Sequence, residues 1–162
     1  MRTVIVAAAL LLVGCRSVVV ETADPSLQVL NVERRAVLAG TESERLFSQC
    51  SRQAPKPQSF WTPSPDTIDS LEADFLSYFR SLRRQSHVPL IDYYRQYAGF
   101  VRDGQRLVYC SFLTLPKGMP ETFYAQIKSR AMVMCDGGDL FFGVVYDLDR
   151  RVFSEYRPNG GI

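Results

Sequence analysis

The sequence has very little histidine and no large excess of either charge, and both shortages narrow the functions it can serve. Its 162 residues include one histidine, 19 lysine and arginine residues and 17 aspartate and glutamate residues. A single histidine gives little basis for a histidine-based catalytic set or a zinc site. The formal net charge of +2 gives no broad basic surface of the kind that nucleic-acid binding requires. We expect no nucleic-acid partner, no metal and no cofactor.

The sequence also lacks an apolar run long enough to cross a bilayer. The longest run, residues 3–13, follows Met1-Arg2. As a helix it would rise about 16 Å, against roughly 30 Å of hydrocarbon. A charged start, a short apolar core and small residues before a processing point are the parts of a secretory signal. We therefore expect residues 1–14 to be a signal peptide.

The predicted signal ends in Leu12-Val13-Gly14-Cys15. This segment resembles the lipobox of bacterial lipoproteins, in which an aliphatic residue, a small or branched residue, Gly or Ala, and Cys follow in that order. The resemblance implies that Cys15 carries acyl chains that anchor the chain in a membrane, because each buried methylene favours insertion. Arg16, in place of the Asp that often retains such proteins at the inner membrane, implies the periplasmic face of the outer membrane. An ordinary signal peptide with an incidental Cys15 is the alternative.

After Cys15 the chain divides into a short tether and one folded domain. Residues 15–26 show no sustained period and are predicted to be the tether. Residues 27–162 are long enough for a single domain with a usable core. Within this domain, Thr41 and Glu44 fit a capping box, which predicts a short helix over residues 42–51.

One longer amphipathic helix is predicted over residues 66–84. Ser64 can cap its first turn, and Pro65 fits the first helical position, where no amide donor is needed. Apolar residues then recur every three or four positions, the pattern of a helix with one buried face. These residues are Ile68, Leu71, Phe75, Leu76, Phe79 and Leu82. His87 follows the helix, and we interpret it as a cap or loop residue because no partner for a catalytic base is evident.

After Pro89 the apolar pattern changes to the two-residue period of strands. Five stretches rich in Tyr, Phe and Val predict strands: residues 92–101, 106–113, 130–135, 140–147 and 151–157. Glycines in residues 102–105 and 136–139 indicate hairpin turns, and residues 147–150 are predicted to turn as well. These short connections predict an α+β fold, with the main helix packed on a curved sheet of four or five antiparallel strands.

A recurring order of turns and aromatic residues runs through the same half of the chain. It consists of residues 94–100, Asp136-Gly137-Gly138, Phe142, Tyr146-Asp147 and Asn159-Gly160. This order resembles a group of small, uncharacterised bacterial envelope proteins, over most of residues 46–160. The resemblance implies a compact domain of the cystatin-like or cone-shaped roll kind, and it implies no activity.

Both faces of the predicted strand 140–147 are apolar. Phe142, Val144 and Tyr146 point to one face, whereas Phe141 and Val145 point to the other. One face suits the amphipathic helix. The other must be covered by the N-terminal part of the domain, or it forms a pocket or a partner surface.

Three cysteines remain beyond the predicted lipidation site, namely Cys50, Cys110 and Cys135. An exported protein can form a disulfide, and an odd count leaves one thiol over. Cys110 and Cys135 both fall in predicted strands that can lie side by side. We therefore predict a disulfide between these two, although the sequence alone does not determine the pairing.

Two classes of function remain open. No nucleophile–base set is evident, which favours a noncatalytic module that binds an envelope protein or cell-wall component. Such a module would use an aromatic sheet face or the stretch 114–125. The alternative is a small roll-type enzyme or small-ligand carrier with a pocket between the main helix and the sheet. Asp92, Tyr97 and Tyr109 are the candidate ligand-facing residues.

Overall fold

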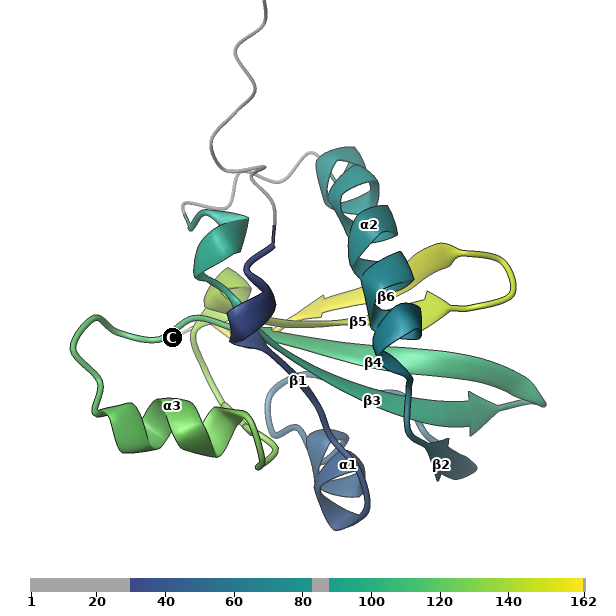
Figure 1. Ribbon diagram of the computed structural model, residues 1–162, viewed down its shortest axis with the longest axis horizontal. Helices are drawn as coiled ribbons and strands as arrows, with labels where there is room; N and C mark the ends of the chain where they lie inside the picture. Colours follow the sequence, from purple (N-terminus) through teal and green to yellow (C-terminus); the bar gives the residue numbers. More distant parts are fainter. Residues whose placement is uncertain (1–29, 83–87, 162) are drawn as a thin grey trace, which may run out of the picture.

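The computed structural model describes residues 30–82 and 88–161. The predicted signal peptide, Cys15, the tether and His87 all lie outside the described residues. The described chain forms an α+β unit in which an open, mixed sheet of six strands is the middle layer (Figure 1). The helix α2 lies on one side of this sheet, and the short helix α1 lies on the other (Figure 1).

The strands are β1 (Arg35–Val37), β2 (Ser59–Trp61), β3 (Tyr94–Arg102), β4 (Gln105–Leu113), β5 (Phe141–Asp147) and β6 (Val152–Pro158). Their order is β1-β3-β4-β5-β6, and β2 also pairs with β3. The meander from β3 to β6 is antiparallel, as predicted. The sheet as a whole is mixed, because β1 runs parallel to β3 while β2 pairs with β3 in the antiparallel sense. Neither three-residue strand was predicted, since three residues are too few to show a period.

Two of the predicted turns join strands as expected. Asp103 and Gly104 both have positive φ, of 52° and 75°, and connect β3 to β4. Between β5 and β6, Oδ1 of Asp147 accepts hydrogen bonds from the backbone amides of Asp149 and Arg150, both at 3.0 Å. Arg151, with φ of 55°, takes the position where glycine is usual.

The main helix, α2 (Pro65–Ser81), confirms the predicted start. Ser64 is its N-cap, and the Ser64 hydroxyl accepts a hydrogen bond from the amide of Thr67 at 3.3 Å. The helix ends earlier than the predicted residue 84, since Leu82 already forms its C-cap.

The other two helices are short. The helix α1 (Thr41–Leu46) begins after Gly40, not at a Thr41 cap, so the predicted capping box was wrong. Gly40 has φ of 56°, and its carbonyl accepts a bond from the Ser43 hydroxyl at 2.7 Å. The helix α3 (Glu121–Ile127) lies at the end of the stretch 114–125 and extends two residues past it.

The predicted strand 130–135 and the hairpin at 136–139 were wrong. The fully buried Gln96 side chain holds this segment in place of a strand ladder. Its Nε2 donates to the carbonyls of Ile127 and Arg130 at 2.7 and 2.6 Å, and its Oε1 accepts from the amide of Met132 at 2.8 Å. Because one side chain satisfies these backbone groups, the segment needs no neighbouring strand.

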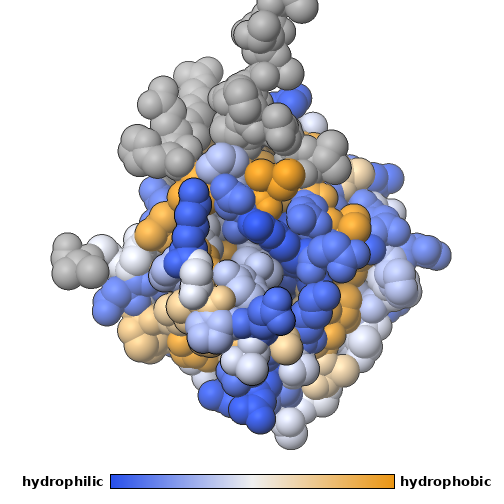
Figure 2. Space-filling model, turned by 60° about the vertical axis from the view of Figure 1, so that its left-hand side comes forward, coloured by the Kyte–Doolittle hydropathy of each residue, from blue (hydrophilic) through white to orange (hydrophobic). Residues whose placement is uncertain are grey.

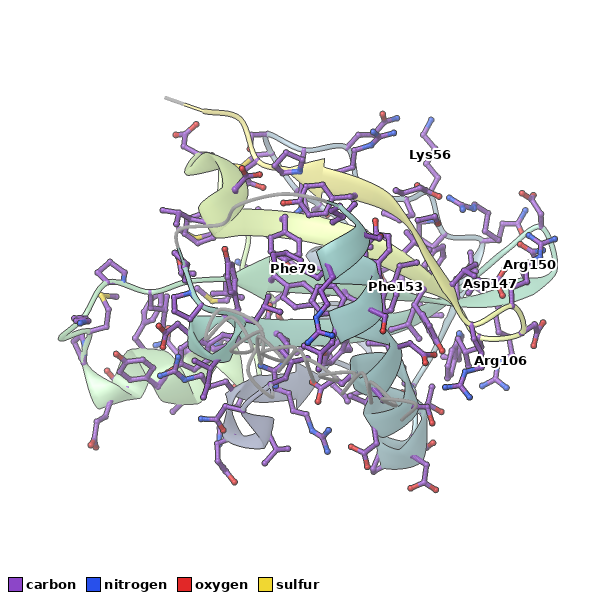
Figure 3. The ribbon with its side chains drawn as sticks, turned by 90° about the horizontal axis from the view of Figure 1, so that it is seen from above. Lys56, Phe79, Arg106, Asp147, Arg150 and Phe153 are labelled. Carbon is purple, nitrogen blue, oxygen red and sulfur yellow. A yellow bond between two sulfur atoms is a disulfide. The ribbon has the colours of Figure 1, made fainter. Side chains whose placement is uncertain are left out.

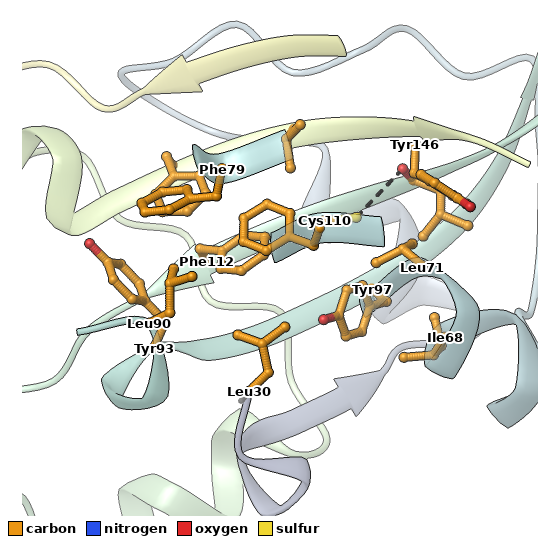
Figure 4. Packing of buried hydrophobic residues seen from close by; sticks show 14 residues of the cluster. Leu30, Ile68, Leu71, Phe79, Leu90, Tyr93, Tyr97, Cys110, Phe112 and Tyr146 are labelled. Atoms are coloured by element: carbon orange, nitrogen blue, oxygen red, sulfur yellow. Dashed lines mark hydrogen bonds between the residues drawn. The ribbon is translucent and has the colours of Figure 1, made fainter. Parts of the chain in front are cut away.

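Aromatic rings fill the space between α2 and the sheet. Phe75 of α2 stacks on Phe112 of β4, with centroids 4.5 Å apart, and Phe112 stacks on Phe142 of β5 at 4.4 Å. Figure 4 shows this cluster with Cys110 in its midst. Cys110 is fully buried and unpaired. The space directly beneath α2 is therefore core, and the hollows found between this helix and the sheet lie at its edge, beside Arg151.

The opposite face of the sheet is also covered. Leu38, Leu46 and Phe47 pack on it together with Ala54 and Ala131, so cover comes from several short segments. Rings of Phe47 and Tyr109 lie 4.9 Å apart across this interface. Of the three alternatives left open for this face, cover by the N-terminal part of the domain is the one the structure shows, with Ala131 added to it.

The disulfide links Cys50 and Cys135, whose Cα atoms are 5.1 Å apart. The predicted pair of Cys110 and Cys135 was wrong. Cys110 points into the core beneath α2, whereas Cys135 lies at the surface in the segment that is not a strand. The bond ties the segment after α1 to the segment before β5.

Candidate functional site

Tyr97 and Tyr109, two of the three predicted ligand-facing residues, lie in the interior with 0% and 2% exposure. The Tyr97 hydroxyl donates to Oε1 of Glu72 at 2.7 Å, and burial raises its pKa well above the usual value. The Tyr109 hydroxyl accepts from Nε of Arg52 at 2.9 Å, and burial raises its pKa also. Neither ring reaches a ligand-accessible surface, so the structure removes both from the candidate site.

A buried ion-pair network provides the partner that allows the Tyr97 hydroxyl to lie in the interior. Glu72 of α2 accepts from Nε of Arg95 at 2.8 Å and lies 3.2 Å from Nη1 of Arg35. Arg95 is fully buried, and its other nitrogens donate to the carbonyls of Tyr93 and Asn31 at 3.0 and 2.6 Å. The network joins α2, β1 and β3, and it borders none of the three cavities described below.

Arg52 forms a second buried polar cluster, on the opposite face. Besides Tyr109, it donates to Oδ1 of Asn159 at 2.6 Å and to the Ser111 hydroxyl at 2.7 Å. Among the described residues no carboxylate lies within ion-pair distance of it, so three neutral oxygens hold this cation. Asn159 continues the cluster by donating to the carbonyl of Met134 at 2.6 Å.

The third predicted residue, Asp92, lines a groove at the end of the sheet where β3 starts and β4 ends. We call it the α3 groove. It is lined by Arg34, Val88, Asp92, Tyr94, residues 114–117, Tyr124, Leu140 and Phe141. Its volume is about 470 Å³, which lies within the range of roughly 300–1,000 Å³ for small-molecule sites. Figure 2 turns this side of the molecule forward and shows apolar side chains beside strongly hydrophilic ones at the surface.

Aromatic and aliphatic side chains dominate the α3 groove. The rings of Tyr94 and Tyr124 lie 5.6 Å apart, one from β3 and the other from α3. Leu140, at the end of the 3₁₀ turn η4 (Gly138–Leu140), is 43% exposed, which few large apolar side chains of the described residues are. Apolar surface left open beside polar groups is typical of a binding site.

Arg34 and Asp92 form the polar edge of the groove. Nη1 of Arg34 donates to Oδ1 of Asp92 and to the carbonyl of Ile91, both at 3.1 Å. The guanidinium carbon of Arg34 lies 5.1 Å from the centre of the Tyr94 ring, a cation–π distance. Burial raises the pKa of Tyr94 despite this cation, so its hydroxyl stays neutral at physiological pH.

Two more open hollows, of about 330 and 320 Å³, flank Arg151 where α2 meets the turn between β5 and β6. Arg151 donates to both carboxylate oxygens of Asp74, at 3.0 and 2.8 Å, and Tyr146 donates to Oδ2 of Asp74 at 2.6 Å. Burial and Asp74 together raise the pKa of Tyr146 to about 12. Arg151 lies between the two hollows with its guanidinium already paired to Asp74, so it is not available to a ligand there without breaking this ion pair.

The charged turns at the far end of the sheet also have internal partners. Arg106 lies over the ring of Trp61 at 4.0 Å, and Arg150 is 3.8 Å from the carboxylate of Asp147. Figure 3 shows Arg106, Asp147 and Arg150 together at this end, away from α3. Asp147 and Arg150 match each other's charge, and Arg106 has the Trp61 ring as its partner, which gives no argument for a ligand there.

The α3 groove is lined mainly by apolar and aromatic side chains, with Arg34, Asp92 and Lys117 as its charged groups. Within residues 30–82 and 88–161 there is no group of three His, Cys, Asp or Glu side chains that could hold a metal ion. No helix in the described part of the chain is long and apolar enough to span a bilayer. The groove offers one carboxylate, Asp92, already bound to Arg34, and no nucleophile paired with a base.

Comparisons with models of protein families, with curated proteins and with solved structures found no match. The site therefore stands on its own geometry. The sequence singled out Asp92 and the stretch 114–125, and the structure brings these two together. The sequence did not indicate Arg34 as a groove residue, or Leu140 as an exposed one. Their positions depend on how η2 (Val32–Arg34) and η4 meet the end of the sheet.

Proposed function

We propose that this chain is a lipid-anchored lipoprotein of the bacterial envelope whose folded domain is a noncatalytic binding module. The lipobox-like residues Leu12–Cys15 support the anchor, and the implied location is the periplasmic face of the outer membrane. The α3 groove supports the binding role. It is an open, mainly apolar cavity, and no acid–base or nucleophilic set lines it.

The observation that carries the binding role is the contrast between the groove and the rest of the sheet. Both broad faces are filled by α2 and by the segments around α1, so neither is free to bind a partner. The stretch 114–125 was the remaining candidate from the sequence, and its residues 114–117 and Tyr124 line the groove. The proposed binding site therefore lies at the end of the sheet and not on one of its faces.

The anchor is tested by metabolic labelling with an alkynyl palmitate in a bacterium that expresses the full chain. We expect label on the wild-type protein and none on Cys15→Ser, which should accumulate uncleaved. Equal label on both chains, or a cleaved unlabelled wild-type product, would refute lipidation at Cys15.

The binding role is tested by chemical crosslinking in intact envelopes, with two matched variants. Leu140→Glu places a charge in the α3 groove, whereas Val152→Glu places one on β6 at a similarly exposed apolar residue, 43% against 49%. We expect Leu140→Glu alone to lose the crosslinked species of the wild-type chain. Identical patterns for both variants would exclude the groove as the binding site.

A further inference from the structure

The α3 groove combines an apolar interior with cations that are not fully neutralised. Lys117 lines the groove and forms no ion pair with any described residue. Arg34 donates its hydrogen bonds to Ile91 and Asp92 through Nη1 alone, which leaves Nε and Nη2 without a hydrogen-bond partner among the described residues. Among the described residues that line the groove, Asp92 is the one acid, and it already binds Arg34. These described residues therefore give the rim a net positive charge.

The interior of the groove offers few hydrogen-bonding groups to a ligand. Leu115, Pro116, Leu140 and Phe141 contribute apolar side chains, and Thr114 already directs its hydroxyl toward the carbonyl of Leu140 at 3.5 Å. A peptide placed here would bring amides and carbonyls that need partners. A hydrocarbon chain brings none and gains from leaving water.

We propose, resting on the proposed function, that the α3 groove binds a single-chain amphiphile with an anionic head. The hydrocarbon chain lies against Leu140, Phe141 and the paired rings of Tyr94 and Tyr124. The carboxylate or phosphate head lies at the rim, where Lys117 and the free nitrogens of Arg34 provide charge-assisted donors. No bond is made or broken in this binding.

The anchor would keep such ligands within reach. Arg34 follows Leu30, where the described chain begins, by only a few residues. Fourteen residues lie between Cys15 and Leu30, and the fifteen steps from one Cα to the other span at most about 54 Å when fully extended. A domain anchored through Cys15 therefore stays close to a membrane, which is the main source of fatty acids and lysophospholipids.

The experiment uses membranes from cells that express the unlabelled full chain, treated with a photoactivatable alkynyl oleate and irradiated. Crosslinked peptides are located by mass spectrometry, and unlabelled oleate, oleoyl lysophosphatidate and oleyl alcohol serve as competitors. We expect saturable labelling of peptides that contain Tyr94, Tyr124 or Leu140. Oleate or lysophosphatidate should compete, and the stronger competitor identifies the head group, whereas the neutral alcohol should compete about tenfold less well.

Two variants give the matched control. Lys117→Glu reverses a charge at the rim, and Lys56→Glu reverses one on the side of the molecule away from α3 (Figure 3). We expect Lys117→Glu to need about tenfold more probe for the same labelling, and Lys56→Glu to behave as the wild type. Since added oleate is not the acyl group of Cys15, this result is independent of the palmitate labelling that tests the anchor.

Labelling spread evenly over the surface, or unaffected by any competitor, would refute the ligand site while leaving the proposed anchor intact. Equal competition by the alcohol and the anions would refute the anionic head. Equal labelling of both lysine variants would do the same.

Discussion

Both faces of the sheet are covered, but by different means. On the α2 face, one helix covers a continuous aromatic cluster, and its internal charges meet in the carboxylate of Glu72. On the opposite face, several short segments cover the sheet, a disulfide joins two of them, and the buried cation of Arg52 has only neutral partners. The difference teaches that a long amphipathic helix is not the only way to cover a sheet face. The second face is covered by the short helix α1 and irregular segments that a disulfide and buried hydrogen bonds hold together.

The sharpest test of the α2 face is Glu72→Ala. It leaves Arg95 buried without its carboxylate, and we expect a loss of about 3–5 kcal/mol in the free energy of unfolding. The matched control is Asp69→Ala. Asp69 also binds Arg35, but its side chain is 59% exposed, so its loss should cost under about 1 kcal/mol. Urea unfolding measures both, and similar values for the two would contradict the role of the buried network.

The opposite face is tested by replacing Cys50 and Cys135 together with alanine. The disulfide spans a sequence separation of 85 residues, and its loss should reduce stability by about 2–4 kcal/mol through the entropy of the unfolded chain. Digestion of the unreduced protein should first give a linked peptide that contains Cys50 and Cys135. A linked peptide that contains Cys110 would overturn this pairing, and with it the claim that a disulfide joins the segments on the face opposite α2.

Arg52→Met should have a smaller effect on the same face. Methionine fills much of the space, but the hydroxyl of Ser111 and Oδ1 of Asn159 lose their donor, at a cost of about 1–3 kcal/mol. Because Tyr109 shares the cluster, Tyr109→Phe combined with Arg52→Met should cost less than the sum of the single variants. Strict additivity in urea unfolding would mean that the cluster does not act as a unit.

The smallest effect is expected at the edge, where Tyr146 binds Asp74. The Tyr146 pKa of about 12 exceeds the ordinary value near 10. The contribution of the Tyr146 hydroxyl to the free energy of unfolding is therefore complete below pH 10 and disappears as the pH rises through about 12. The Asp74 pKa is lowered, chiefly by its hydrogen bond from Arg151, so its contribution is complete above about pH 4 and is lost in acid. Asp74→Asn should lower the Tyr146 pKa, as read by tyrosine NMR titration, and an unchanged value would leave burial as the whole cause.

The sequence predicted features that depend on local interactions and missed those that depend on contacts between distant residues. The start of α2 was predicted correctly because Ser64, Pro65 and the apolar spacing act within a few turns of the chain. The β3–β4 hairpin was correct for the same reason, since Asp103 and Gly104 define its turn. The strand predicted at 130–135 failed because Gln96, more than thirty residues away, satisfies the backbone there.

For the candidate site, the sequence identified the stretch 114–125 and Asp92 but mistook two core tyrosines for ligand residues. The alternation of β3 places Tyr97 on an apolar face, and no local pattern reveals that Glu72 of α2 accepts its hydroxyl. Likewise, no spacing rule connects Arg34 to Tyr124, since they belong to segments that meet only at the end of the sheet.

The sequence by itself determined the helix-and-meander class of this fold, the N-cap of α2 and the two tight turns that join β3 to β4 and β5 to β6, because these depend on neighbouring residues and on apolar period. Only the tertiary structure decided that Cys135 pairs with Cys50, that the second sheet face is closed, and that an apolar groove remains beside α3. These features depend on which distant segments come within contact distance, and contact across the chain leaves no period in the sequence.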